Sequence, residues 1–597
     1  MYVKSIPRKS PKILSMTSAT TSSLPGATLA DRLDAQAHAL LARASGGLSP
    51  ASALLAWQDW AVHLANSPGK QMALAQLAGT QAQALSQYMR ARLQAAPDHE
   101  QVLVEPPAQD RRFVDPAWRK WPFCLWQQSF LLTEQWWDAA THGVSGVDRH
   151  HENMVSFWAR QWLDMFSPGN RLATNPLALR RTVEELGANL VRGAQHLVED
   201  LQQAVTGTGP ETGFTVGRDV AVTPGQVVLR NRVMELIQYA PATGLVHAEP
   251  VLLIPAWIMK YYILDLSPHD SLVKYLVDQG HTVFCISWKN PGEAERDLGM
   301  DDYLRDGFHA ALDAVNAILP KRKVHAAGYC LGGTLLAIAA AAMARDGDTR
   351  LASTSYFAAQ TDFSEPGELG LFIDASQVSL LEAQMAKTGY LKASQMAGAF
   401  QMLRSYDLLW SRLVHDYLLG DRSGFNDLMA WNADTTRMPA TMHSQYLRRL
   451  FLNDDLSEGR YPVDGRPVSL GSLTLPTFMV GTATDHVAPW RSVHKLHYLC
   501  PAEITFVLTS GGHNAGIVNP PVSTSKRQYQ WLTREAGGTY LAPDEWLAAA
   551  STVRGSWWPA WQQWLAARSG AQVKPPRMGS SAYPATADAP GSYVLEK

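Results

Sequence analysis

The stretch Gly328-Tyr329-Cys330-Leu331-Gly332-Gly333 decides the fold of this chain. It follows a β-rich run at residues 324–328 and leads into an alanine-rich helical run at residues 334–343. A turn this sharp between a strand and a helix strains its central residue, and side chains two positions before and after it would collide. Glycine at both positions removes that collision. The stretch therefore predicts a nucleophile elbow with Cys330 at its tip.

Within this turn, Gly328 and Gly332 are expected to make room for the backbone. The side chain of Cys330 would emerge at the carboxyl edge of a sheet and at the amino terminus of a helix, where the helix dipole favours a thiolate. The backbone amide of Leu331 would donate a hydrogen bond to an adjacent oxyanion. We therefore predict that Cys330 is a nucleophile and that Leu331 is an oxyanion donor.

The alternative for Cys330 is a structural role, because most free cysteines are small buried residues. Cys124, Cys285 and Cys500 fit that description, since they lie among aromatic residues, in mid-strand and at a helix end. The scattered cysteines form no C-x-x-C pair, so they predict neither a disulfide framework nor a zinc ribbon, and they indicate a reducing compartment. Only Cys330 has an elbow around it, which favours the nucleophile.

Short β-rich runs alternate with helical segments over residues 206–573, which predicts a parallel sheet wrapped by helices. The predicted strands cover residues 251–254, 282–288, 324–329, 353–358, 477–480 and 504–509. Between the fourth and the fifth strand lie about 110 residues, where a short loop and one helix would suffice. Helical patterning in this interval predicts a cap domain inserted at about residues 364–474.

Two polar side chains follow the last two predicted strands in the order that an elbow enzyme requires: nucleophile, acid, histidine. Asp485 comes after the strand that ends at residue 480, and His513 comes after the strand that ends at residue 509. Because parallel strands end at one edge of a sheet, both side chains should lie near Cys330. His513 would take the thiol proton, and Asp485 would fix its tautomer and stabilise the imidazolium.

Three further histidines compete for a role here. His486 is a rival base, but it is adjacent to Asp485, and an extended backbone would point the two side chains in opposite directions. His494 and His497 could form a metal pair, yet no third ligand is evident. We interpret these two as ordinary histidines on a helix surface.

A cysteine nucleophile favours one kind of reaction. A cysteine acyl-enzyme is itself a thioester, so exchange with a thiol-borne acyl group is nearly isoenergetic, and the acyl group stays activated if water is excluded. Cys330 below a cap therefore indicates acyl transfer from a thioester.

The N-terminal part has a different pattern. Apolar residues at helical spacing predict an all-helical domain over residues 29–205, with an aromatic-dense stretch at residues 113–137. Those aromatic side chains are expected to be mostly core, and the alternative is a surface that meets an apolar partner. The compositions of residues 1–28 and 574–597 predict a disordered tail, with a transit peptide as the alternative, and a loose C-terminal segment.

The amino-acid composition limits the kinds of partner that this protein can bind. The 597 residues include 52 lysines and arginines against 54 acidic residues without a basic block, which excludes nucleic acid as the main partner. No apolar stretch reaches the roughly 20 residues that span a bilayer. We predict a protein with neither a nucleic-acid partner nor a transmembrane segment.

Motifs beyond the elbow resemble those of the poly(3-hydroxyalkanoate) synthases, the bacterial polyester polymerases. They are DRRFVDPAW at 110–118, KYYILDL at 260–266, ISWKNP at 286–291, WNADTTRMP at 431–439 and GHNAG at 512–516. The resemblance runs from residue 110 to about residue 542. It implies an α/β-hydrolase fold with an inserted helical cap, preceded by a helical N-terminal domain. It also implies polymerisation of (R)-3-hydroxyacyl-CoA with release of CoA, and no cofactor besides this thioester substrate.

By this resemblance, Cys330 carries the growing chain and His513 activates it, whereas Asp485 would instead, or also, activate the attacking 3-hydroxyl. Trp431 matches a tryptophan associated with dimerisation and activity, and its alternative is a core aromatic of the cap. The resemblance favours class I, which uses short acyl chains, over class II. It further implies a homodimer at polyester granules in the cytoplasm, with phasin-type granule proteins as additional partners.

The loop after the first predicted parallel strand departs from the family pattern, which usually reads Pro-Pro-x-Ile-Asn-Lys-Tyr-Tyr. Here Ala256 replaces the second proline and Met259 replaces the asparagine. This loop should supply the second oxyanion donor, for which we expect the amide of Ile258. Two other functions compete with polymerisation: a thioesterase or depolymerase on the same fold, which a cysteine at the elbow disfavours, and a non-catalytic granule protein.

Overall fold

The computed structural model describes residues 29–45, 47–94, 102–107, 110–206, 212–392, 395, 409–422, 424–522 and 527–597. The tail predicted at residues 1–28 lies outside the described residues. No helix in these ranges is both long enough and apolar enough to cross a membrane.

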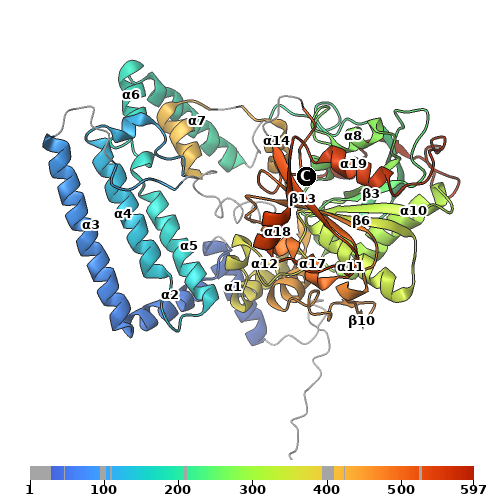
Figure 1. The fold of residues 1–597 in the computed structure, drawn as a ribbon, viewed down its shortest axis with the longest axis horizontal. Coiled ribbons are helices and arrows are strands. Elements are labelled where there is room, and N and C mark those ends of the chain that lie inside the picture. Colours follow the sequence, from blue (N-terminus) through green and yellow to red (C-terminus); the bar gives the residue numbers. More distant parts are fainter. Residues whose placement is uncertain are drawn as a thin grey trace, which may run out of the picture.

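A large sheet forms the centre of the C-terminal part (Figure 1). It has 11 strands in the order β14-β13-β12-β11-β6-β5-β3-β4-β2-β1-β15. The strands are β1 (Gly225–Arg230), β2 (Met234–Tyr239), β3 (Val251–Ile254), β4 (Val283–Trp288), β5 (Val324–Tyr329), β6 (Leu351–Phe357), β11 (Thr477–Thr482), β12 (Ile504–Thr509), β13 (Gln528–Arg534), β14 (Ser551–Arg554) and β15 (Ala587–Asp588). Strands β12, β11, β6, β5, β3 and β4 run parallel to one another, so the predicted parallel sheet is confirmed. The flanking strands β1, β2, β13, β14 and β15 pair antiparallel and were not predicted.

Helices cover both faces of this sheet, and the central strands are buried along their whole length, as expected for a sheet wrapped on two sides. The helices are α8 (Leu272–Asp278), α9 (Met300–Asp302), η5 (Tyr303–His309), α10 (Ala310–Ile318), α11 (Leu331–Asp346), α16 (Trp490–His494), α17 (Leu496–Leu499), α18 (Pro543–Ala549) and α19 (Trp558–Ala566), with short turns η3 (Tyr261–Leu264), η4 (Glu293–Glu295) and η11 (Tyr593–Leu595). Helix α11 is apolar on all sides and buried against one face. The tryptophans of α19 fill the core on the other face.

An insertion between β6 and β11 forms the cap, at the predicted position. It contains η6 (Glu368–Phe372), α12 (Ala375–Thr388), β7 (Tyr390–Leu391), η8 (Leu413–Leu419), α14 (Asp427–Ala433), β8 (Met438–Pro439), α15 (Ala440–Tyr446), η9 (Leu447–Leu452), β9 (Pro462–Val463), β10 (Arg466–Pro467) and η10 (Leu470–Ser472). Strands β7 and β8 pair with each other and tie the first half of the insertion to the second.

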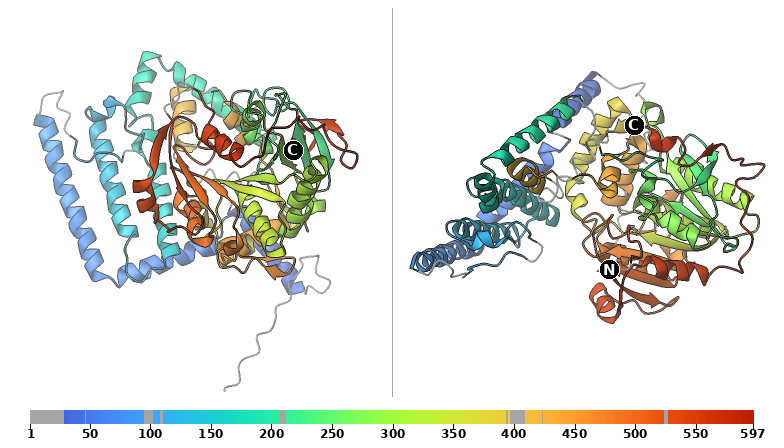
Figure 2. Two further views of the ribbon diagram at one scale, coloured as in Figure 1. Left: turned by 45° about the vertical axis from the view of Figure 1, so that its right-hand side comes forward. Right: turned by 90° about the horizontal axis from the view of Figure 1, so that it is seen from above.

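The N-terminal part is helical, as predicted, and extends away from the sheet (Figure 2). Its helices are α1 (Leu29–Ala44), α2 (Pro50–Ala65), α3 (Pro68–Gln94), η1 (Pro116–Arg119), α4 (Phe123–Thr141), α5 (Arg149–Met165), η2 (Pro168–Asn170), α6 (Pro176–Glu184) and α7 (Ala188–Thr206). Several of these helices contact the cap, as two hydrogen bonds illustrate. The Ser49 amide donates to Gln377 Oε1 at 2.7 Å, and Asn189 Nδ2 donates to the Leu418 carbonyl at 2.7 Å.

The aromatic stretch of the N-terminal part divides between core and surface. Phe113, Trp118 and Phe130 are buried and pack in edge-to-face pairs. Trp121 and Trp126, by contrast, are 47% and 49% exposed. Core packing is therefore confirmed for the first three residues, whereas contact of the two exposed tryptophans with an apolar partner stays a prediction.

The prediction of a loose segment at residues 574–597 is wrong. Strand β15 pairs with β1, the backbone amides of Ser592 and Tyr593 donate to the buried Glu235 carboxylate, and Val594 is buried. A composition rich in proline and glycine predicts little regular structure, but it does not preclude long-range contacts of this kind.

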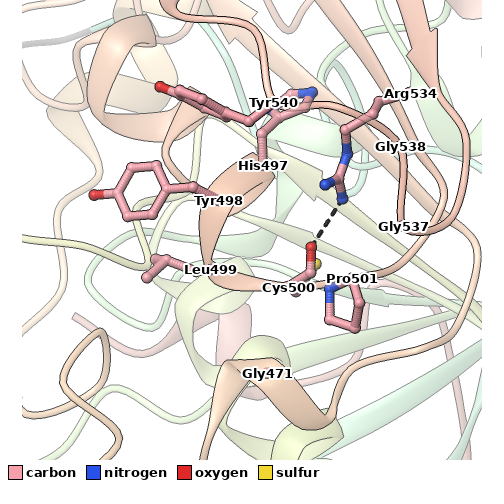
Figure 3. Close-up of a pocket in the computed structure, with 10 residues that line it drawn as sticks. All are labelled: Gly471, His497, Tyr498, Leu499, Cys500, Pro501, Arg534, Gly537, Gly538 and Tyr540. Atoms are coloured by element: carbon pink, nitrogen blue, oxygen red, sulfur yellow. Dashed lines mark hydrogen bonds between the residues drawn. The ribbon is translucent and has the colours of Figure 1, made fainter.

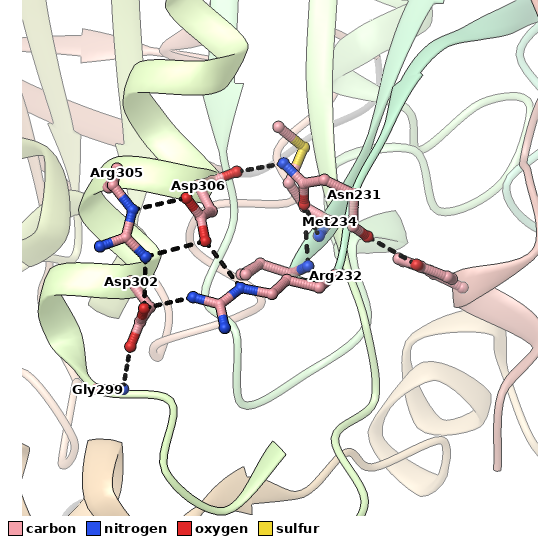
Figure 4. Close-up of polar contacts among 9 residues, drawn as sticks. Asn231, Arg232, Met234, Gly299, Asp302, Arg305 and Asp306 are labelled. Atoms are coloured by element: carbon pink, nitrogen blue, oxygen red, sulfur yellow. Dashed lines mark hydrogen bonds and ion pairs between the residues drawn. The ribbon is translucent and has the colours of Figure 1, made fainter. Parts of the chain in front are cut away.

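A polar cluster fixes the β1–β2 turn to η5 (Figure 4). Arg232 pairs with Asp302 at 2.5 Å and with Asp306 at 2.9 Å, and Asn231 Nδ2 donates to the Asp306 carbonyl at 2.6 Å. Because the Arg232 side chain is half exposed, each ion pair contributes at most about 1 kcal/mol. The cluster positions the edge of the sheet rather than forming a site.

Candidate active site

The elbow has the strained geometry that its sequence predicts. Cys330, between β5 and α11, has φ 53° and ψ −125°, a conformation that residues with side chains rarely adopt. A Cβ on Gly332 would lie 2.0 Å from the Ile254 carbonyl oxygen, and one on Gly328 would lie 2.4 Å from the Gly333 Cα. The turn is therefore packed against the end of β3 as well as against itself, and neither glycine can be replaced without moving backbone.

The structure brings the three predicted catalytic residues, Cys330, Asp485 and His513, together at the carboxyl edge of the sheet. His513 Nδ1 lies 2.8 Å from Asp485 Oδ2. The Cys330 sulfur lies close enough to the His513 ring to raise the pKa of that imidazole. The loops after β11 and β12 deliver Asp485 and His513, as the sequence predicts.

Asp485 is held firmly in a buried position. Its Oδ2 also accepts a hydrogen bond from Thr482 Oγ1 at 2.7 Å, and its Oδ1 accepts from the amides of Val487 and Ala488 at 2.9 and 2.8 Å. Burial alone would raise the pKa of this carboxyl, but His513 and these donors lower the pKa below its usual value. Asp485 is therefore an ionised, fully hydrogen-bonded carboxylate.

The electrostatics of His513 follow from this pairing. Burial alone would lower its pKa, yet the Asp485 carboxylate and the Cys330 sulfur raise the pKa well above its ordinary value. An imidazole with a raised pKa readily accepts a proton from an adjacent thiol. The arrangement can therefore generate a thiolate at Cys330.

Two tyrosines at the site were not identified from the sequence. Tyr446, from α15 of the cap, is buried close enough to Cys330 that the sulfur contributes to the raised pKa of this phenol, after burial itself. The Tyr329 ring packs 5.5 Å from the His513 ring, and its hydroxyl donates to Asn514 Oδ1 at 2.6 Å. Tyr329 lies within the elbow motif, whereas no local pattern marks Tyr446, which only the folded cap brings to the site.

The predicted oxyanion donors lie on the two segments that flank Cys330. Leu331 is the first residue of α11, where backbone amides have no partner within the helix. Ile258 follows β3, whose Ile254 pairs with Gly328 of β5, so its loop runs past the elbow. The Trp257 carbonyl, in the same peptide unit as the Ile258 amide, accepts from Thr436 Oγ1 at 3.1 Å.

Trp431 is a core residue of this chain. It is 2% exposed, and its indole Nε1 donates to the Lys260 carbonyl at 2.8 Å. This contact joins the cap to the loop after β3. The core interpretation of Trp431 therefore describes its position, and its link to dimerisation stays a prediction.

The other histidines fall outside the site. His486 is exposed, so it does not compete with His513 as the base. The prediction that His494 and His497 lie on a helix surface is wrong: both are buried, with rings stacked at 4.1 Å beside Phe506. Their helices are short and packed on the sheet, which periodicity over four or five residues does not reveal. Among the described residues, one cluster has the spacing of metal ligands, formed by His269, Asp270 and Asp427. Neither of the two stacked histidines belongs to it.

A shallow cavity of about 470 Å³ lies beside the buried histidines (Figure 3). Its lining includes His497, Tyr540 and Arg534, and Arg534 donates to the Cys500 carbonyl at 2.8 Å. It sits where β12 begins, whereas Cys330 and His513 lie where the parallel strands end. This cavity is therefore distinct from the candidate active site.

Comparisons with known proteins cover most of the chain. Profiles described as "Poly-beta-hydroxybutyrate polymerase N terminal", "Poly-beta-hydroxybutyrate polymerase (PhaC) N-terminus" and "alpha/beta hydrolase fold" match residues 28–70, 109–276 and 249–520. A poly(3-hydroxyalkanoate) polymerase from Methylorubrum extorquens is 42% identical over 500 residues, which cover 83% of this chain and 82% of the relative. The corresponding subunit from Cupriavidus necator is 38% identical over 501 residues, covering 82% and 84%. The α/β-hydrolase fold is thereby confirmed.

Proposed function

Because the chain belongs to the poly(3-hydroxyalkanoate) polymerase family, we propose that it joins (R)-3-hydroxyacyl groups from CoA thioesters into a polyester and releases CoA. The observation that carries this proposal is the His513–Asp485 pair, hydrogen-bonded at 2.8 Å, next to Cys330 at a strained elbow beneath a cap. The protein is accordingly an acyltransferase, with the CoA thioester as its substrate.

The first step is acyl transfer to sulfur. His513 takes the proton of Cys330, and the thiolate attacks the thioester carbonyl. The resulting oxyanion accepts hydrogen bonds from the backbone amides of Leu331 and Ile258. When the C–S bond to CoA breaks, the leaving thiolate takes the proton from His513. Cys330 then holds the acyl group as a new thioester.

The second step lengthens the chain. The 3-hydroxyl of a second 3-hydroxyacyl-CoA attacks the Cys330 thioester, a C–O bond replaces the C–S bond, and His513 receives the hydroxyl proton and returns it to the sulfur. The lengthened acyl-CoA then acylates Cys330 again, as in the first step, and releases CoA. The hydrogen bonds of Asp485 support its role as the partner of His513. Both of its carboxylate oxygens are already occupied by Thr482, His513 and two amides, so direct activation of a hydroxyl would require breaking one of these bonds.

The N-terminal helices supply the contact with the polymer. Trp121, Trp126 and Trp162 are all about half exposed, and Trp162 stacks on Phe166, itself 54% exposed. Exposed aromatic side chains such as the Trp162–Phe166 pair are what a binding face for an apolar partner requires. These side chains support work at the surface of cytoplasmic polyester granules. The resemblance to the family, rather than the tryptophans, is what supports a class I homodimer in company with phasin-type granule proteins.

The product distinguishes this proposal from hydrolysis on the same fold. Purified protein is incubated with 3-hydroxybutyryl-CoA, and CoA, insoluble polymer and free 3-hydroxybutyrate are measured. Polymer together with CoA is expected, with no release of CoA by Cys330→Ala. Free acid as the main product would make the protein a thioesterase, and no release of CoA by the parent protein would leave the non-catalytic granule role.

A further inference from the structure

A buried seam joins the cap to the loop that follows β3. Thr436 Oγ1 donates to the Trp257 carbonyl at 3.1 Å, and the Trp431 indole donates to the Lys260 carbonyl at 2.8 Å. Between these two bonds, Met259 and Thr435 form an antiparallel bridge. Thr436 and Trp431 are each 2% exposed, so these contacts are shielded from water.

The loop on the other side of the seam lies against the elbow. Ile254 pairs with Gly328, and the carbonyls of Ile254 and Pro255 approach Gly332 so closely that they leave no room for a Cβ. The Pro255 carbonyl is itself held by the Trp288 indole at 2.7 Å. The backbone that continues from this point therefore has a fixed start beside Cys330.

The bond from Thr436 also fixes the direction of an amide. The Trp257 carbonyl and the Ile258 N–H belong to one planar trans peptide unit, in which the C=O and N–H bonds point in opposite directions. A donor that holds the carbonyl on the cap side therefore directs the N–H away from the cap segment. Without that donor, the peptide unit can rotate, and the buried carbonyl would lack this hydrogen bond.

We propose that Thr436 is a positioning residue for the oxyanion site: through the Trp257 carbonyl it aims the Ile258 amide at the oxygen of the acyl group on Cys330. In this role Thr436 acts through its hydrogen bond to the Trp257 carbonyl. Because Thr436 belongs to the cap, the oxyanion site is complete only while the cap is seated on the loop. This inference rests on the proposed acyl transfer at Cys330.

The test compares Thr436→Val, Thr436→Ala and Thr436→Ser in the full-length protein. Valine keeps the shape of threonine but has no hydroxyl. Alanine also lacks the hydroxyl, and its smaller side chain cannot clash with neighbouring residues. Serine keeps a hydroxyl that can donate to the Trp257 carbonyl. Loss of a single oxyanion donor costs roughly 10²–10³ in kcat, and misalignment of one that remains should cost about 10–100-fold. We expect that loss in valine and alanine, a KM within about twofold of the parent, and at least half of the parent kcat in serine.

Alkylation of Cys330 by iodoacetamide distinguishes a misplaced Ile258 amide from a less reactive Cys330 thiolate. Alkylation needs the thiolate but no oxyanion donor. The rate should stay within about twofold of the parent in all three variants. The proposal is overturned if valine and alanine keep the parent kcat, if serine fails to rescue it, or if alkylation slows in parallel with turnover. Failure of the proposed function looks different, since the parent protein would then give free 3-hydroxybutyrate as its main product or release no CoA at all.

Discussion

His513 Nδ1 lies 2.8 Å from the Asp485 carboxylate, and the Cys330 sulfur is close enough to the same ring to raise the pKa of His513. This relationship places the proton acceptor between a buried negative charge and the thiol. The hydrogen bond to Asp485 determines which nitrogen of His513 carries the proton and which one is left to face the Cys330 thiol. The three residues come from three separate loops, so the sheet itself sets their spacing.

Replacement of Asp485 by asparagine should disable the base without unfolding the protein. The amide can donate to His513 Nδ1 and so favour the wrong tautomer, with the proton on the nitrogen that faces Cys330. We expect kcat for CoA release to fall by roughly 10³–10⁴, as in other enzymes with this arrangement. Thr482→Val removes one neighbour of the same carboxylate and is the matched control, with an expected loss of about tenfold or less. Equal losses in both variants would contradict the tautomer argument.

Packing of the elbow makes Gly332 intolerant of any side chain. Gly332→Ala would place a Cβ 2.0 Å from the Ile254 carbonyl oxygen, so backbone must move. Overpacking of this kind costs typically 1–3 kcal/mol, and here we expect at least about 3 kcal/mol in urea unfolding, together with loss of activity. Gly244→Ala is the control, because nothing lies within 4 Å of a Cβ there. A variant at Gly332 as stable as the one at Gly244 would refute this account of the turn.

The sequence allows prediction of the elbow, the order of acid and base, the parallel strands and the cap, since each depends on residues that are neighbours along the chain. What it does not reveal depends on contacts between distant segments. Tyr446 reaches Cys330 only because the cap folds over the edge of the sheet, and residues 574–597 are ordered by Glu235, more than 300 residues away. The burial of His494 is likewise set by aromatic neighbours from other elements.

Buried histidines should make the protein sensitive to mild acid. Burial lowers the pKa of His281 and His494 to about 3 and that of His497 to about 4. An unfolded histidine titrates near 6.5, so between pH 6.5 and these values the unfolded chain binds more protons, and stability falls as the pH decreases. Each group contributes up to about 1.4 kcal/mol per pH unit in that window.

Urea unfolding of His494→Phe at pH 7.0 and pH 5.5 tests this effect, because phenylalanine suits the surrounding rings of Trp490, Phe506 and Trp546. The free energy of unfolding should decrease less for the variant than for the parent, by about 1 kcal/mol. His486→Phe, at an exposed position, is the matched control for the substitution itself. The same pH dependence in parent and His494→Phe would show that this ring does not titrate as its burial requires.

Exposed tryptophans of the N-terminal helices should govern attachment to polymer. Replacement of Trp121, Trp126 and Trp162 by serine removes apolar surface without touching the sheet, and we expect several-fold weaker partitioning onto polyhydroxybutyrate granules in a sedimentation assay. Point variants are preferable to deletion of the helices, because α1 and α7 also contact the cap. The control is serine at the three exposed aromatic positions Tyr498, Trp531 and Tyr540, which lie on the sheet domain. Equal partitioning of both triple variants would place the polymer contact elsewhere.

The central claim is that the sulfur of Cys330 carries the acyl chain. The most direct measurement is mass spectrometry of peptides from protein quenched in acid shortly after mixing with 3-hydroxybutyryl-CoA. The account predicts 3-hydroxybutyryl adducts, single and in series, on the peptide that contains Cys330, and none on peptides with Cys124, Cys285 or Cys500, which are buried. Rapid release of CoA with no adduct on Cys330, or with the adduct on another cysteine, would contradict it.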